Sequence, residues 1–215
     1  MEIQAAIYRL HQQLPLQARQ DQLTPALKQL HQLILCALAK QGVPPGRNEM
    51  AEVVGAAKLS AALQRLGAMD LVVLDRTHSV VLGAYPLTTE VTPHQLRMGQ
   101  HSIYAMCALD AVSVAPMFAT AVTINSRCHV SGEPVQIHMQ GHDVLSAQQD
   151  TVMVGIRWQL PSAVAAHSMC TEMVFLKDLS SAQQWQAGEV DAISIFTLPE
   201  SIAFGAGFFV PLLAR

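Results

Sequence analysis

The chain has 215 residues, of which 51% are hydrophobic and only 13% are charged. This composition excludes an intrinsically disordered protein, which needs low hydrophobicity and high charge, and the length suffices for one substantial core or two small ones. A net charge of −3 and a pI near 6.3 give no general attraction to nucleic acid, so no nucleic-acid partner is expected.

The termini carry no feature that predicts a membrane location. The apolar segment at residues 201–213 is too short to cross a bilayer and is interrupted by Gly205, Gly207 and Pro211. Glu2 and the polar residues 11–13 argue against a signal peptide. We therefore expect a cytoplasmic protein without a membrane partner, whose four cysteines remain free thiols.

The first 84 residues show helical spacing of apolar residues, followed by a hairpin pattern. Three helices and a hairpin predict a winged-helix-like N-terminal domain over residues 1–84. The predicted elements are helices at residues 27–38, 48–54 and 59–67 and strands at residues 71–74 and 79–82.

Residues 85–93 are rich in Thr and Pro and are predicted to be a linker into a second domain, residues 85–215. An apolar helix is expected first, at residues 102–115, and short strands with packing helices follow. The fold class is therefore predicted as α+β with a mainly antiparallel sheet. The expected strands are at residues 121–125, 127–130, 135–139, 152–158, 168–176 and 192–198, with a turn at 131–134, a helix at 181–186 and a closing helix after Pro199.

Cys107 and Asp110 are three positions apart in the apolar segment at residues 102–115. On a helix this spacing places both side chains on one face. A carboxyl among Ala, Met, Leu and Val side chains is costly to bury as an anion, so we expect a raised pKa and a proton available for donation. A packing cysteine beside a surface aspartate explains the same two residues.

Cys170 lies in residues 168–176, whose pattern predicts a buried strand. Two facing thiolates chelate soft metal ions, so Cys170 gains a chemical role if the fold brings it to Cys107, which sequence spacing does not establish. Glu172 falls on the same face of the predicted strand as Cys170. An exposed residue or ion-pair partner is the favoured interpretation of Glu172.

The other cysteines and the histidines give weaker indications. Cys128 adjoins His129, but neighbours on a strand point to opposite faces, so a shared metal ion is not expected and Cys128 is predicted to be structural. Cys36 is predicted to lie in the core of the helix at residues 27–38. The 9 histidines show no HExxH or paired spacing, and no P-loop or GxGxxG in a nucleotide-binding context is present, so neither zinc nor a nucleotide is expected.

The order of these motifs resembles the alkylmercury (organomercurial) lyases. The residues that carry the resemblance are the segment Tyr104-Ala105-Met106-Cys107-Ala108-Leu109-Asp110, Cys128 ahead of Ser131-Gly132-Glu133-Pro134-Val135, Cys170, Trp185 and Ala203-Phe204-Gly205. The resemblance extends over about residues 79–213, and the N-terminal part shares only the winged-helix-like architecture of the family. Met106 and Thr171 depart from the commoner family pattern, which bears on substrate range.

The resemblance implies that Cys107 and Cys170 bind mercury and that Asp110 transfers the proton beside the product Hg(II), while Cys128 is structural. The implied reaction is protonolysis of R–Hg⁺ to R–H and Hg(II), which requires no cofactor. The implied partners are small organomercurials, low-molecular-weight thiols, and a mercuric reductase that receives the Hg(II).

Two non-enzymatic interpretations remain open. A metal-responsive regulator would join a DNA-binding winged helix to a soft-metal sensor. The predicted recognition region has only Arg47, Lys58 and Arg65 as basic residues, which is few for contacts with DNA phosphates. A metal-binding or chaperone protein could keep the two thiols without lyase activity. Chelation alone needs no proton donor, so Asp110 separates this alternative from an enzyme.

Overall fold

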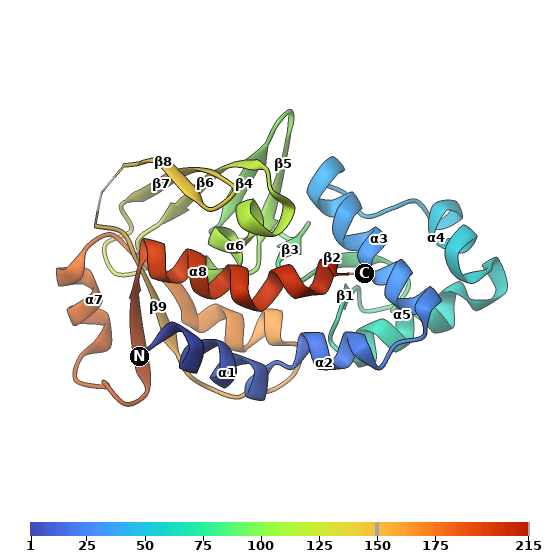
Figure 1. Ribbon diagram of the computed structural model, residues 1–215, viewed down its shortest axis with the longest axis horizontal. Helices are drawn as coiled ribbons and strands as arrows, with labels where there is room; N and C mark the ends of the chain where they lie inside the picture. Colours follow the sequence, from blue (N-terminus) through green and yellow to red (C-terminus); the bar gives the residue numbers. More distant parts are fainter. Residues whose placement is uncertain (149–150, 215) are drawn as a thin grey trace.

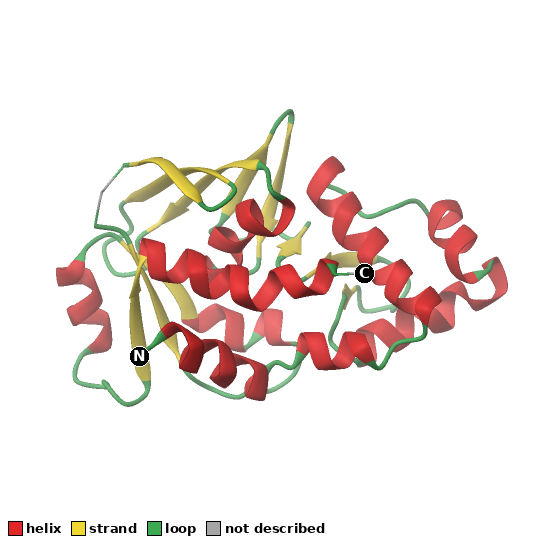
Figure 2. Cartoon of the chain, in the orientation of Figure 1, coloured by secondary structure: helices red, strands yellow, loops and turns green. Residues whose placement is uncertain are grey.

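The computed structural model describes residues 1–148 and 151–214 and combines helices with two sheets (Figures 1 and 2). The larger sheet has the order β1-β2-β3-β5-β4-β6-β7-β8, and the smaller has the order β10-β9-β11. Throughout the described residues, neighbouring strands in both sheets run antiparallel, which confirms the predicted α+β class. The strands are β1 (Val73–Leu74), β2 (Val81–Ala84), β3 (Leu87–Thr88), β4 (Gln95–Met98), β5 (His101–Ala105), β6 (Ala121–Arg127), β7 (Pro134–Gln140), β8 (Asp143–Ala147), β9 (Met153–Arg157), β10 (Met173–Leu176) and β11 (Ile193–Thr197).

The helices of the N-terminal part form two groups. The three predicted helices are present as α3, α4 and α5, whereas α1 and α2 pack along the C-terminal helix α8 and the turn that follows it. The longest helix, α3, begins where the Thr24 hydroxyl accepts the N–H of Leu27 and ends at Gly42 in the left-handed region (φ +74°). The helices are α1 (Ile3–Gln13), α2 (Leu16–Asp21), α3 (Pro25–Gln41), α4 (Arg47–Val54), α5 (Leu59–Ala68), α6 (Ala108–Phe118), α7 (Leu179–Gln186) and α8 (Leu198–Phe209).

The predicted hairpin is formed by β1 and β2. The Asp75 carboxylate closes its turn by accepting the N–H groups of Ser79 and Val80 at 2.9 and 2.8 Å. Strand β2 then pairs with β3, so the hairpin continues directly into the eight-stranded sheet. The winged-helix description and the boundary between residues 84 and 85 remain predictions.

Helix α6 lies at the centre of the molecule. Each of its residues from Ala108 to Met117 is buried, and it packs against the sheets on one side and α8 on the other. The two helices approach closely at Gly205, where an added Cβ would lie 2.0 Å from Oγ of Ser113. This close packing gives the start of α6 a rigid support.

Four segment predictions were wrong. Strand β6 ends at Arg127 and a turn follows, so residues 127–130 do not form the predicted separate strand. Tertiary burial explains the other three. Residues 102–105 belong to β5, whose alternating Ile103 and Ala105 point inward, so a helix begins only at Ala108. The predicted linker at residues 85–93 contains β3, and residues 83–88 are buried throughout. Residues 169–172 form a 3₁₀ turn, η3 (Met169–Glu172), and the strand begins only at Met173.

In the described residues, no helix combines the length and the apolar character that a membrane span requires.

Candidate active site

Cys107 stands where β5 has ended and α6 begins. Its backbone is extended (φ −153°), and its Sγ accepts the N–H of Asp110 at 3.3 Å, so it is the N-cap of α6 rather than a residue within a helix. The thiol is 1% exposed and donates to Sδ of Met173 at 3.6 Å. The helix N-terminus favours a thiolate, but burial outweighs it and raises the pKa of Cys107 well above its usual value. The thiol is therefore protonated at rest.

Asp110 occupies the first turn of α6 with its side chain inside the protein. The residue is 2% exposed, and its Oδ2 has no hydrogen-bond partner among the described residues. Burial penalises the anion and raises the pKa of Asp110 to about 8, although hydrogen bonding to Cys107 acts in the opposite direction. The expected rise is thus present, and a carboxyl with this pKa exchanges protons near neutral pH.

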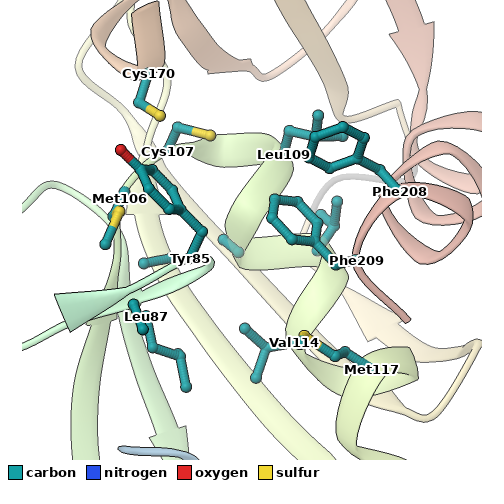
Figure 3. Packing of buried hydrophobic residues seen from close by; sticks show 14 of the residues in the cluster. Tyr85, Leu87, Met106, Cys107, Leu109, Val114, Met117, Cys170, Phe208 and Phe209 are labelled. Carbon is teal, nitrogen blue, oxygen red and sulfur yellow. The ribbon is translucent and has the colours of Figure 1, made fainter. Parts of the chain in front are cut away.

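Cys170 approaches these two residues from η3, directly before β10, and is 3% exposed. The sulfurs of Cys107 and Cys170 and a carboxylate oxygen of Asp110 all lie within 4.8 Å of one another. Figure 3 shows the two thiol side chains next to each other. Hydrogen bonding with the Cys107 side chain lowers the pKa of Cys170, but burial and the charges of Asp110 and Asp70 outweigh it and leave the pKa raised. The fold therefore brings together the three residues that the sequence singled out.

A cavity of about 710 Å³ opens beside this trio. Its wall is largely apolar, with Met106, Met173 and Phe175 among the side chains that form it. Cys170 lines the cavity, whereas Cys107 and Asp110 do not appear among the described residues of its wall. Of the three residues, a ligand in the cavity would therefore meet Cys170 first.

Cys128 lines the same cavity but does not join the trio. It lies in a turn rather than on a strand, where its N–H donates to the carbonyl of Glu133 and its carbonyl accepts the N–H of Gly132, both at 2.8 Å. Burial alone would raise the pKa of Cys128, but hydrogen bonds from the hydroxyl and N–H of Ser131 and from the N–H groups of Lys177 and Val130 lower it to about 7. These contacts connect the turn to the segment after β10.

The remaining candidates have ordinary contacts. Glu172 pairs with Arg157 at 3.1 Å, as expected for an ion-pair partner. The His129 ring meets Trp185 edge-on, and Cys36 lies half-buried on α3.

The two positions that depart from the family pattern both border the cavity. Met106 is 7% exposed and forms part of the wall beside Cys107. Thr171 turns its hydroxyl away to the carbonyl of Ser168 at 2.6 Å. Both positions can therefore affect which ligands fit, without altering the trio.

Three further residues of the cavity wall were not singled out from the sequence. His94 is buried, its Nδ1 lies 2.8 Å from the Ser126 hydroxyl, and burial lowers its pKa to about 4. The Glu90 carboxylate lies 3.0 Å from Nε2 of His167, and both residues belong to the wall. No local pattern marks these residues, because only the fold brings residues 90–94 against residues 166–175.

Two buried thiols and a buried carboxyl beside a largely apolar cavity form a group that could hold a soft metal ion in an α+β protein. Residues 87–210, more than half of the chain, match the sequence model described as alkylmercury lyase. The chain belongs to the alkylmercury lyase family, in agreement with the resemblance noted in its motifs.

Curated relatives agree with this assignment. The chain is 31% identical over 122 residues to an alkylmercury lyase of Staphylococcus epidermidis, covering 57% of this chain and 56% of the relative. It is 28% identical over 99 residues to an alkylmercury lyase of Bacillus cereus, covering 46% of this chain and 45% of the relative. The matches thus span about half the length of these relatives.

The fold also has a counterpart among solved structures. A crystal structure of the mercury-bound form of MerB2 superimposes with a TM-score of 0.68 at 19% identity, covering 89% of this chain and 100% of that one. At this identity the similarity concerns the fold.

Proposed function

We propose that this protein is an organomercurial lyase that cleaves the carbon–mercury bond of R–Hg⁺ by protonolysis, with Cys107, Cys170 and Asp110 as its reacting groups. The observation that carries the proposal is the separation of at most 4.8 Å between the two sulfurs and the buried carboxyl oxygen. Mercury(II) is a soft ion that prefers sulfur, and two thiolates at this separation suit one such ion.

The first step is capture of the mercurial at Cys170, which lines the cavity. A mercurial arrives as its adduct with a small thiol, R–Hg–SR′. The Cys170 sulfur replaces the small thiol on mercury, and the Cys170 proton leaves with it as R′SH. The apolar wall favours the organic group R, because its contact with water is removed.

The second step breaks the carbon–mercury bond. The ionised Asp110 carboxylate takes the proton of Cys107, whose sulfur binds mercury as the second ligand. Donation from two sulfurs increases the negative charge on carbon, and Asp110 delivers its proton there. R–H is released, Hg(II) remains on the two thiolates and Asp110 is again a carboxylate. A pKa of about 8 suits a group that acts first as base and then as acid near neutral pH.

We further propose that the reaction needs no cofactor and that Cys128 is structural. Low-molecular-weight thiols would remove Hg(II) by exchange, with a mercuric reductase as a possible recipient. The four free thiols of the described residues suit a reducing compartment, and we propose the cytoplasm. A regulator or metal chaperone would have no use for the buried carboxyl at 4.8 Å or less from both sulfurs.

Removal of the proton donor tests the proposal. Purified protein with phenylmercury and excess thiol is expected to release benzene, measured by gas chromatography. Asp110→Ala should still bind one Hg(II) per chain but release benzene about 10²- to 10⁴-fold more slowly. Asp143→Ala, which removes an exposed carboxyl on β8, is the matched control. Benzene release by Asp110→Ala at the wild-type rate, or none by the wild type, would refute the proposal.

A further inference from the structure

Cys170 is carried by irregular backbone. Between β9 and β10 the described chain forms only two 3₁₀ turns, η2 (Ala165–His167) and η3, so neither a strand pair nor a long helix fixes this thiol. The hydroxyl hydrogen bonds of the turns are local, from Ser168 to the Val164 carbonyl and from Thr171 to the Ser168 carbonyl. At the end of η3, Glu172 pairs with Arg157 of β9 at 3.1 Å, with both side chains partly exposed. Contacts from other parts of the chain must therefore set where Cys170 lies.

Tyr85 and Asp70 supply such contacts to η2. The Tyr85 hydroxyl accepts the N–H of Ala166 at 2.9 Å, and Oδ2 of Asp70 accepts the N–H of Ala165 at 3.2 Å. The Tyr85 hydroxyl also donates to Oδ1 of Asp70 at 2.8 Å. Two consecutive backbone donors of η2 are thus bound by one connected pair of side chains.

The same pair is attached to the backbone that carries Cys107. The carbonyl of Pro86, which directly follows Tyr85, accepts the N–H of Met106 at 3.3 Å. In Figure 3 the Tyr85 ring lies near Cys107, with its hydroxyl directed toward Cys170. Tyr85 is 1% exposed, so its ring is held by packing. The dipeptide Tyr85-Pro86 therefore contacts the supports of both thiols, Tyr85 through η2 and Pro86 through Met106.

Asp70 connects the N-terminal helices to this arrangement. It follows α5 and has a left-handed backbone (φ +50°), and Arg19 of α2 lies 3.6 Å from its Oδ2. Its side chain is only 14% exposed, so the bonds that it accepts are shielded from water. The Glu90–His167 pair also reaches η2, but its side chains are 41% and 55% exposed, and an exposed ion pair contributes little. Tyr85 and Asp70 are the stronger attachment.

We propose that Tyr85 and Asp70 are positioning residues that hold η2, and through it the sulfur of Cys170, at chelating distance from the sulfur of Cys107. Neither side chain touches the substrate in this proposal. The consequence for turnover rests on the proposed lyase function, since a misplacement of about 1 Å can reduce a rate about 10²-fold. The consequence for the thiols does not depend on that function.

Tyr85→Phe is the decisive variant, because it keeps the buried ring and removes only the hydroxyl. Loss of a hydrogen bond of ordinary strength is expected to increase opening of η2 and η3 about tenfold. Alkylation of Cys170 by iodoacetamide, followed by peptide mass spectrometry, should accelerate by that factor while Cys107 is little affected. In turnover of phenylmercury, kcat should fall about 10- to 100-fold with little change in KM.

Asp70→Asn is the second variant, and it tests the positioning role even if Tyr85→Phe does not fold. Its amide oxygen can still accept from Tyr85, but its NH₂ cannot accept the N–H of Ala165, so the same selective labelling should appear. Tyr8→Phe, on an exposed ring, and Asp143→Asn, an exposed carboxyl on β8, are matched controls that should label like the wild type.

The outcomes separate positioning from general stability. Loss of stability alone would expose all four thiols together, and this result would overturn the proposal. Unchanged Cys170 labelling in both folded variants would also overturn it. If the wild type releases no benzene, the lyase function fails, while the labelling of Cys170 still decides the positioning role.

Discussion

The two halves of the site are supported in different ways. Cys107 caps α6 and Asp110 lies in its first turn, a hydrogen bond links them directly, and the helix is buried from Ala108 to Met117. Cys170 belongs to η3, where the backbone is irregular and side chains from distant parts of the chain hold the neighbouring turn. The positions of Cys107 and Asp110 are thus fixed by local structure, whereas the position of Cys170 depends on tertiary contacts.

This difference explains how the site can hold its carboxyl in a fixed position and still expose a thiol to a ligand in the cavity. A helix N-terminus inside the core holds the carboxyl where water cannot compete for its proton. The irregular turn places Cys170 at the cavity wall, where a ligand can reach it. Regular structure suits the proton transfer, and irregular structure suits the capture.

The largest expected effect comes from removing either thiol. Cys107→Ser and Cys170→Ser should each reduce hydrocarbon release on the order of 10³-fold or more, and the double variant should be no worse, because the two sulfurs act as a unit. The comparison predicts a further difference. Cys107→Ser should still form an adduct with phenylmercury at Cys170, detected by intact-protein mass spectrometry.

Cys170→Ser should form much less adduct at Cys107, located by peptide mass spectrometry, since Cys107 is not among the described residues of the cavity wall. Adduct at Cys128, which lines the cavity, is measured separately. Cys36→Ser, a half-buried thiol on α3, is the control. Equal adduct formation by the two active-site variants would contradict the assigned order of capture.

A smaller effect, on stability, isolates the helix half of the site. Asp110 has an ordinary pKa of 3.8 when unfolded and about 8 when folded. Between these values the folded protein holds one proton more, so the free energy of unfolding should decrease as pH rises, by up to about 1.4 kcal/mol per unit. Asp110→Asn should flatten this dependence and be more stable than the wild type at pH 8.

Urea unfolding at pH 5 and pH 8 measures this dependence. Asp143→Asn, an exposed carboxyl on β8, should keep the wild-type dependence. An Asp110→Asn curve parallel to that of the wild type would show that burial of this carboxyl does not affect folding.

The smallest effect concerns the support behind Cys170. The turn of Cys128 is joined to β10, the strand that follows η3, by the N–H of His129 donating to the carbonyl of Phe175 at 2.8 Å. Cys128→Ser should lower the free energy of unfolding by about 1–2 kcal/mol, while the folded variant still releases hydrocarbon. Thermal melting with a parallel benzene assay checks this. A stable but inactive Cys128→Ser would mean that this cysteine takes part in the reaction.

The same contrast governs what could be predicted from the sequence. Cys107 and Asp110 are close in the chain, so their proximity and the raised pKa of Asp110 followed from local spacing and apolar neighbours. The meeting of Cys107 with Cys170 could not follow from spacing, and it was expected only through the family resemblance. Tyr85 was not singled out, because it lies in a Thr- and Pro-rich segment that was predicted to be a linker. Its burial depends on partners elsewhere in the chain, which the local sequence does not reveal.

Errors in the fold have similar physical causes. Small apolar residues fill residues 102–115 so evenly that neither a two-residue nor a helical period stands out, and the change from β5 to α6 at Cys107 was missed. Strand β8 is almost entirely exposed and lacks the alternation that marks a strand. The hairpin and α3 were predicted correctly, because apolar residues at helical spacing and two apolar runs around a polar turn mark them locally.

Among the three proposed reacting groups, Cys170 is the one found in the described part of the cavity wall, and this has a kinetic consequence for the proposed enzyme. Incoming substrate and outgoing Hg(II) must use the same sulfur and the same opening. A thiol that removes the product therefore attacks mercury from the cavity, where its own bulk competes with the next substrate. Turnover would then depend on the size and concentration of the acceptor thiol, and a slender dithiol would clear the site faster than a bulky monothiol.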